Sequence, residues 1–195
     1  MQLQVSTNSH TPEEYLALEE ATDSKHEYRD GQIVPMARGT KNHNKISGNF
    51  YAQLKLGLKG QDYDLYIGDV RLWIPRYRQY TYPDLMIIPG DFIYPGTDAT
   101  PVMSPLLIAE VLSKSTKSYD QGEKFTYYRS IPELSEYILI DQSNYHVMQY
   151  NKFSENQWLL TEYTSEKAAL MLESVDLQID LSDIYERVNF DESEE

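Results

Sequence analysis

Apolar residues recur along this chain with two different periods, which together predict an α/β fold. Residues 85–88 (LMII) and 106–111 (LLIAEV) are apolar runs with the length of buried strands. Residues 41–59 repeat an apolar residue at helical spacing and predict an amphipathic helix that packs on a sheet. The segment between the two runs is rich in Gly and Pro, so we expect the two strands to pair in antiparallel fashion.

Short signals predict elements on both sides of these runs. Thr11, followed by a proline and two glutamates, predicts a helix start. Asp30-Gly31 predicts a tight hairpin between two short strands. Asp120 has a glutamate three residues later, so we expect it to cap a helix that starts near this position. Gly68 interrupts residues 63–75, which therefore predict one bent strand or two short ones.

Period-two alternation dominates the C-terminal third. It predicts a strand at residues 133–141, a hairpin across Ser154-Glu155, two short edge strands between 169 and 181, and a final turn capped by Ser182. Because helices are expected mainly in the first two thirds, the fold class is α/β with a mixed central sheet flanked by helices and additional C-terminal β-hairpins. We expect a single domain over residues 1–190 and an acidic tail at 191–195.

Two carboxylates and one lysine accompany the apolar runs. With Pro89 opposite Leu106, Asp84 would lie opposite Val111 and next to Glu110. Lys124 would lie on the helix that follows the second strand, close enough to reach both acids. A carboxylate pair suits a hard cation such as Mg²⁺ or Mn²⁺. Ordinary structural roles remain the alternative, although a charge inside an apolar strand needs a strong local partner to offset its desolvation.

The same residues carry a resemblance to a known family. The strings YPDLMII, LLIAEVLSKST, YDQGEKFTYYRSIPELSEYILID and HEYRDGQIVPM resemble the bacterial Uma2 family of putative restriction endonucleases, which belongs to the PD-(D/E)-x-K nuclease superfamily. The resemblance runs from TPEEYLALEE near the start to SDIYERV near the end. It implies a restriction-endonuclease-like core and a metal-dependent endonuclease that hydrolyses DNA phosphodiester bonds.

The resemblance also implies roles for individual residues. Asp84 and Glu110 match the family's two acids, expected as catalytic residues and ligands of Mg²⁺ or Mn²⁺, and Lys124 matches its helix lysine. The lysine of the wider superfamily would fall at Leu112, which cannot serve. Glu27 matches a recurrent acid of the family's N-terminal segment and is a further candidate ligand.

Two more residues are auxiliary candidates. Asp69 matches a position close to the family's active-site strands, although a turn aspartate is the alternative. His43 lies at the start of the predicted helix, where hydrogen bonding at the helix end is the alternative to catalysis. We therefore keep both residues as auxiliary candidates for the site.

The amino-acid composition narrows the kinds of site and partner that this protein can have. The chain of 195 residues has no cysteine, which excludes a disulfide framework, a thiolate zinc site and a cysteine nucleophile. It shows no signal peptide or membrane span, so we expect a cytoplasmic, unprocessed protein. The net charge of −14 opposes DNA binding over the whole surface and leaves open a noncatalytic binding or regulatory protein that keeps a nuclease fold.

Local features could still serve a nucleic acid. Lys114, Lys117 and Lys124 follow the second apolar run, and the Arg76-Tyr77-Arg78 group is either a basic rim of the site or a solvated face. The C-terminal strands are more aromatic than a solvated hairpin requires, which predicts a homodimer. The aromatic residues in question are Tyr145, Tyr150, Phe153, Trp158 and Tyr163.

Overall fold

The computed structural model describes residues 9–36, 39–90, 104–113 and 116–191. Lys114, most of the expected acidic tail and most of the segment between the two apolar runs lie outside the described residues. No helix among the described residues combines the length and the apolar character needed to cross a membrane.

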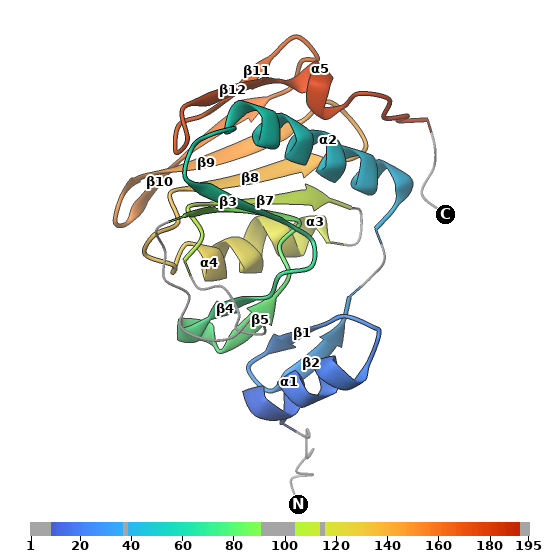
Figure 1. Cartoon of the computed structure of the whole chain (residues 1–195), viewed down its shortest axis with the longest axis vertical. Coiled ribbons are helices and arrows are strands. Elements are labelled where there is room, and N and C mark those ends of the chain that lie inside the picture. Colours follow the sequence, from blue (N-terminus) through green and yellow to red (C-terminus); the bar gives the residue numbers. More distant parts are fainter. Residues whose placement is uncertain (1–8, 37–38, 91–103, 114–115, 192–195) are drawn as a thin grey trace, which may run out of the picture.

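A six-stranded mixed sheet forms the centre of the fold, as predicted (Figure 1). Its strand order is β10-β9-β8-β7-β6-β3, and only the β7–β8 pair is parallel. The strands are β3 (Tyr63–Ile67), β6 (Leu85–Pro89), β7 (Leu107–Leu112), β8 (Glu136–Asp141), β9 (Val147–Ser154) and β10 (Gln157–Tyr163). The two apolar runs of the sequence are β6 and β7, which pair in antiparallel fashion as expected.

Helices cover both faces of this sheet because its central strands are apolar on both faces. Leu85 and Ile87 pack with α2 (Lys41–Gly57) in one buried cluster. Met86 and Ile88 point the other way and share a second cluster with Tyr128, which lies on α4 (Phe125–Tyr128). Figure 1 shows the central strands running between α2 and α4.

A smaller four-stranded sheet adjoins the first, in the order β2-β1-β5-β4. It combines β1 (His26–Arg29), β2 (Gln32–Pro35), β4 (Leu72–Ile74) and β5 (Gln79–Thr81). On it, α1 (Pro12–Ala21) buries Tyr15 against Tyr28 and Tyr80, and the short 3₁₀ turn η1 (Pro75–Tyr77) joins β4 to β5. The predicted break at Gly68 is confirmed, since the two strands on either side of it belong to different sheets.

Two short signals at the N-terminal end are confirmed. Thr11 caps α1, and Glu14 completes a capping box with it. Asp30 and Gly31 both have positive φ values, 41° and 99°, and connect β1 to β2. This backbone conformation is that of a type I′ turn, which explains the Asp-Gly pair.

The predicted register of the central hairpin is wrong by one residue. Leu85 pairs with Ala109 and Ile87 with Leu107, so Asp84 is level with Glu110 rather than with Val111. Successive side chains along a strand alternate between the two faces of the sheet. The observed register lets Leu85 and Ile87 meet the cluster around α2. The shift brings the two acids closer to each other.

The helical segment after β7 begins earlier than predicted, and Asp120 does not cap it. It consists of α3 (Lys117–Tyr119), a π-helical turn η2 (Asp120–Lys124) and α4. Asp120 has helical dihedral angles, φ −65° and ψ −41°, so it lies inside the segment. Ser113 and Thr116 organise the start instead, because each backbone N–H donates to the other's hydroxyl group.

The C-terminal part differs from expectation in two respects. The strands β11 (Ala169–Leu172) and β12 (Leu177–Asp180) form a separate two-stranded sheet rather than edge strands of the central sheet. Helix α5 (Leu181–Ile184) includes Ser182, which therefore does not cap it; Asp180 occupies the cap position. The β9–β10 hairpin is confirmed, with its turn at residues 155–156.

Most of the aromatic residues that predicted a dimer surface contact the chain's own core. Tyr145 packs against Tyr185, and both Tyr150 and Trp158 pack against Phe125. Tyr163 donates a hydrogen bond of 2.6 Å to Gln149. Phe153 differs, since its exposed fraction is 79%.

Candidate active site

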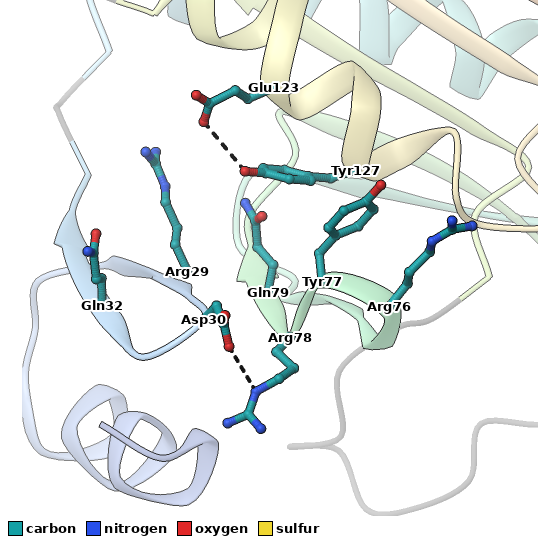
Figure 2. A pocket seen from close by; sticks show the side chains of 9 residues that line it. All are labelled: Arg29, Asp30, Gln32, Arg76, Tyr77, Arg78, Gln79, Glu123 and Tyr127. Atoms are coloured by element: carbon teal, nitrogen blue, oxygen red, sulfur yellow. Dashed lines mark hydrogen bonds and ion pairs between the residues drawn. The ribbon is translucent and has the colours of Figure 1, made fainter. Parts of the chain in front are cut away.

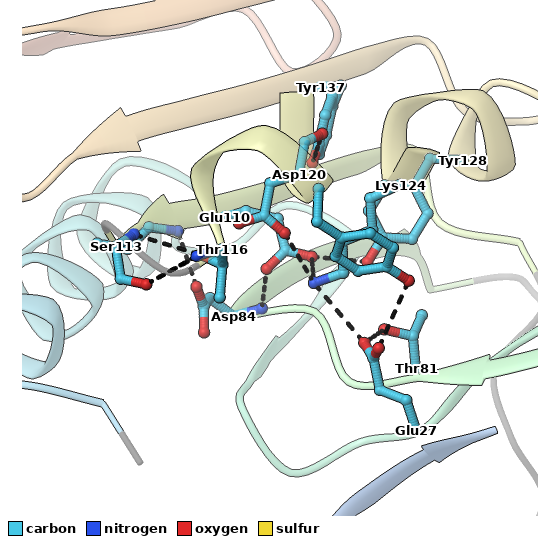
Figure 3. A network of polar contacts seen from close by, with 12 residues as sticks. Glu27, Thr81, Asp84, Glu110, Ser113, Thr116, Asp120, Lys124, Tyr128 and Tyr137 are labelled. Carbon is cyan, nitrogen blue, oxygen red and sulfur yellow. Dashed lines mark hydrogen bonds and ion pairs between the residues drawn. The ribbon is translucent and has the colours of Figure 1, made fainter. Parts of the chain in front are cut away.

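The two carboxylates expected to form the site lie side by side where β6 and β7 meet (Figure 3). Asp84 immediately precedes β6, and its backbone N–H lies 3.4 Å from Oε2 of Glu110. Its own Oδ2 accepts a hydrogen bond of 2.7 Å from the backbone N–H of Val111. Glu110 lies within β7 and is only 3% exposed. The antiparallel register therefore aligns both acids at one end of the hairpin.

Lys124 joins these acids from the helical side. Its Nζ lies 2.8 Å from Oε1 of Glu110 and is buried, with 6% of the residue exposed. The structure thus brings together Asp84, Glu110 and Lys124, the three residues chosen from the sequence. Leu112, the superfamily's lysine position, is buried in the apolar cluster that contains Tyr128. The ammonium group beside Glu110 consequently comes from η2 rather than from β7.

Glu27 also reaches this centre, although it lies on the smaller sheet. It is buried on β1, and its Oε1 lies 3.9 Å from Nζ of Lys124. Thr81 on β5 donates a hydrogen bond to the same carboxylate, and Arg29 donates to its other oxygen. Thr81 and Glu27 both belong to the smaller sheet, and because β5 leads directly into β6, the chain passes from this sheet to the larger one close to Asp84.

The two auxiliary candidates separate in the structure. His43, in the first turn of α2, places its Nε2 3.0 Å from Oδ2 of Asp84. Its backbone N–H also donates to the cap residue Thr40, so it fills the helix-start role as well. Asp69 instead pairs with Lys25 at the surface, where its side chain is 82% exposed. The structure therefore adds His43 to the cluster and leaves Asp69 outside it.

Sequence reasoning missed two members of the network. Asp120, interpreted from sequence as a helix cap, is buried and lies 3.4 Å from Nζ of Lys124. Tyr128 donates a hydrogen bond of 2.6 Å to Oε1 of Glu110. The spacing of four residues between Asp120 and Lys124, and again between Lys124 and Tyr128, was the available signal, because such residues share one face of a helix.

Burial and crowding of like charges dominate the electrostatics. Burial raises the pKa of Glu110 to about 8 even though Lys124 opposes the shift, and the charges of Asp84 and Asp120 add to it. Burial likewise raises the pKa of Asp120. Burial in an apolar strand thus places the pKa of Glu110 above that of an ordinary glutamate.

The other members keep their charged forms. Burial acts to raise the pKa of Asp84, but the hydrogen bond and charge of His43 outweigh it and hold the value below normal. For Lys124, burial acts to lower the pKa, and the charges of Glu110, Asp120 and Glu27 together raise it well above normal. The cluster is thus an acidic site with one buried ammonium group.

The donor set fits a hard divalent cation that keeps most of its water. Among the described residues, no three His, Asp or Glu side chains are grouped as a complete metal site. Asp84 and Glu110 nevertheless adjoin each other, and Mg²⁺ is typically held by one or two carboxylates with waters completing its shell. A cation beside these acids would offset the charge repulsion from Asp84 and Asp120, which adds to the effect of burial on the pKa of Glu110.

Comparison with known proteins agrees with these features. A model of the Uma2 family, described as "Putative restriction endonuclease", matches residues 12–182. An uncharacterized protein of Synechocystis sp. is 40% identical over 170 residues, covering 87% of this chain and 96% of that protein. A second one from the same organism is 34% identical over 180 residues, covering 92% and 93%.

A solved structure has the same fold. The crystal structure titled as a putative nuclease of the DUF820 family from Anabaena variabilis matches with a TM-score of 0.73. The match covers 90% of this chain and 97% of that one at 18% identity. At this identity the likeness concerns the fold alone.

Proposed function

The chain belongs to the Uma2 family of putative restriction endonucleases, and on that premise we propose that it is a metal-dependent endonuclease acting on DNA phosphodiester bonds. The observation that carries the proposal is the convergence of Asp84, Glu110 and Lys124 from three separate elements onto one buried point. A nuclease site needs carboxylates for a cation and a positive group for the phosphate, and these residues supply both.

Each side chain has a distinct role in the proposed reaction. Asp84 and Glu110 would hold Mg²⁺ or Mn²⁺, which when bound supplies charge neutralisation at the phosphate and a more acidic water. Lys124 would orient the attacking water and neutralise the charge that develops on the phosphoryl oxygens. Glu27 and Asp120 keep the ammonium of Lys124 charged, and Tyr128 fixes the orientation of Glu110 through its hydrogen bond. His43 orients Asp84 in the same manner.

A cleavage assay tests this assignment. We expect Asp84→Ala, Glu110→Ala and Lys124→Ala each to lower the rate of Mg²⁺-dependent cleavage by about 100-fold or more, the effect typical of losing one strong electrostatic contact. Several DNA forms should be assayed, with circular dichroism to show that each variant is folded. Asp69→Asn is the matched control, because it removes an acidic charge from an exposed side chain outside the cluster. Nuclease activity that survived all three substitutions would contradict the proposal.

A second candidate function is a noncatalytic nucleic-acid-binding or regulatory protein with a nuclease fold. The net charge of −14 and the buried Leu112 in place of a lysine favour it. Calorimetric titration with Mg²⁺ and Mn²⁺ separates the two functions. Absence of metal binding at millimolar concentration would favour the noncatalytic protein, whereas binding that is lost in Asp84→Ala would favour the endonuclease.

We further propose that the protein acts as a homodimer through the β9–β10 hairpin. Phe153, Leu159 and Leu160 are all exposed there, and β10 is an edge strand of the six-stranded sheet. An edge strand offers unpaired backbone groups to a second strand, and a symmetric pair of sites suits the two backbones of a duplex.

A further inference from the structure

The two described lysines that closely follow β7, Lys117 and Lys124, are both paired with carboxylates. Lys117 forms an ion pair of 2.8 Å with Asp141, and Lys124 is buried among the carboxylates of the active site. Lys114 lies outside the described residues. Within the described part of this chain, whose net charge is −14, phosphate groups would therefore be met by cations other than Lys117 and Lys124.

Arginines gather instead at an open pocket between the small sheet and α4. The pocket has a volume of about 530 Å³, and we call it the arginine pocket. Figure 2 shows the rings of Tyr77 and Tyr127 close to each other, with Arg29 and Arg76 on either side of them. The main residues that line the arginine pocket are Arg29, Arg76, Tyr77, Arg78, Gln79 and Tyr127.

One arginine of the arginine pocket has no ion pair to a carboxylate of the described residues. The two acids that line it are Asp30, which pairs with Arg78 at 3.1 Å, and Glu123, which accepts a hydrogen bond from Tyr127. Arg76 is exposed, and no carboxylate of the described residues forms an ion pair with it. Glu27, which does not line the pocket, pairs with Arg29, so the pocket's positive character rests on Arg76, the guanidinium group with no ion pair to a carboxylate of the described residues.

Arg29 is held in place ready to bind an anion. Its guanidinium group lies 3.9 Å from the ring centre of Tyr119 and donates from Nε and Nη2 to Glu27. A guanidinium group has five N–H donors, so others remain for a further acceptor. Since both its ring contact and its carboxylate partner are fixed, little side-chain entropy would be lost on binding.

The pocket adjoins the active site through a short series of contacts. Nη2 of Arg29 lies 2.5 Å from Oε2 of Glu27, whose Oε1 lies 3.9 Å from Nζ of Lys124. Gln79, on the pocket wall, donates to the hydroxyl group of Tyr119. A strand with its scissile phosphate at Lys124 would therefore bring neighbouring phosphates, spaced at about 3.4 Å along a duplex axis, toward the pocket.

We propose that the arginine pocket binds a backbone phosphate of the substrate DNA strand, a few nucleotides from the scissile bond, through Arg29 and Arg76. This inference rests on the proposed endonuclease function and adds a substrate-binding site to it. The rings of Tyr77 and Tyr127 form the wall against which the adjoining sugar or base packs.

The test measures binding of a short labelled DNA duplex in Ca²⁺ over a range of monovalent salt, alongside cleavage in Mg²⁺. Arg76→Gln should weaken DNA affinity by about 3- to 10-fold and reduce the slope of log affinity against log salt by about 1. Lys55→Gln is the matched control. It removes the same charge from an exposed position on α2, across the six-stranded sheet, and should leave affinity and slope unchanged.

A second measurement identifies the phosphate. Single phosphates on each side of the cleaved bond are replaced in turn by uncharged methylphosphonates. One replacement should weaken DNA binding by the wild type and by Lys55→Gln but should not weaken binding by Arg76→Gln any further. The methylphosphonate and the Arg76→Gln substitution would then remove the same contact. Free inorganic phosphate at millimolar concentration should not show the difference in affinity between the wild type and Arg76→Gln that the DNA shows. An isolated anion lacks the contacts that the neighbouring parts of the DNA strand make.

The outcomes separate this inference from the proposed function. If the wild type cleaves DNA and Arg76→Gln binds it with unchanged affinity and salt slope, the arginine pocket is not a substrate site and the endonuclease assignment stands. If the wild type neither binds nor cleaves DNA, both are wrong. Equal weakening by Arg76→Gln and Lys55→Gln would show a general charge effect and would also overturn the inference.

Discussion

At the scale of single residues, the environment of Glu110 decides how the site responds to pH. A buried carboxyl group with like charges nearby holds its proton, and here burial raises the pKa to about 8. Lys124 and Tyr128 both donate to this carboxyl group, yet they do not fully offset its loss of water. In the proposed endonuclease, binding of a cation at Glu110 would therefore be coupled to release of this proton.

A prediction follows for the metal-free protein. The pKa of Glu110 is higher in the folded state than in the unfolded state, so the folded state binds more protons between these two values. The contribution of Glu110 to stability is then fully present below the unfolded pKa and is lost as pH rises to about 8. Relative to Glu110→Gln, the wild type should lose a few kcal/mol of unfolding free energy across this range, because one pKa unit corresponds to about 1.4 kcal/mol.

Urea unfolding of both proteins in the presence of a chelator, at several pH values, gives this difference. Asp120 and His43 also titrate in the wild type, but they are present in the variant too, so the difference isolates Glu110. Stability curves that stayed parallel from acid to alkaline pH would contradict the assigned environment of Glu110.

At the scale of elements, two local conformations position the site. The π-helical turn η2 contains Asp120 and Lys124, and both side chains point toward Glu110. Such turns are rare and occur frequently at functional sites, because the wider turn changes the direction of the side chains. The second local conformation is the tight β1–β2 hairpin, whose first strand contains Glu27.

We predict opposite effects of alanine at two glycines. Gly31 has a φ of 99°, and an added Cβ would come within 2.3 Å of the Ser9 side chain, so Gly31→Ala should destabilise the protein by about 1 kcal/mol or more. Gly48 lies within α2 with nothing near the added atom, so Gly48→Ala should stabilise it by about 0.5–1 kcal/mol. Thermal unfolding of both variants measures the effects. A more stable Gly31→Ala protein would show that the hairpin turn is not required in this conformation.

At the scale of the whole molecule, the distribution of exposed apolar side chains bears on assembly. Four of the five aromatic residues singled out in the C-terminal strands contact residues of their own chain, and Phe153 remains at the surface with Leu159 and Leu160. Isolated apolar side chains are normal on protein surfaces, whereas a group on an edge hairpin is typical of an interface.

The proposed homodimer predicts a concentration-dependent mass. Light scattering at micromolar protein should give twice the mass of the 22.7 kDa chain for the wild type. Phe153→Ser combined with Leu159→Ser should give a monomer. Leu56→Ser is the control, because Leu56 is 71% exposed on α2 and away from the hairpin. A wild-type protein that remained monomeric throughout would refute the dimer.

Most elements of this protein, and the grouping of Asp84, Glu110 and Lys124, could be predicted from the sequence. The capping box at Thr11, the Asp30-Gly31 turn and the two apolar runs act through neighbouring residues, so their structures could be predicted locally. Asp84 and Glu110 could be paired because Asp84 immediately precedes one apolar run and Glu110 lies in the last part of the other, and the two runs pair in antiparallel fashion. The placement of Lys124 beside these acids could be predicted from its position on the next helical segment and from the family resemblance.

Tertiary structure alone decided which distant residues complete the site. Glu27 reaches Lys124 only because the smaller sheet packs beside the larger one, and His43 reaches Asp84 only because α2 crosses that sheet. The register of β6 and β7 depends on which face meets α2, and Asp120 and Lys124 come close to Glu110 only because their helical segment packs against β7. These outcomes are set by packing between segments far apart in the chain, which local propensity does not encode.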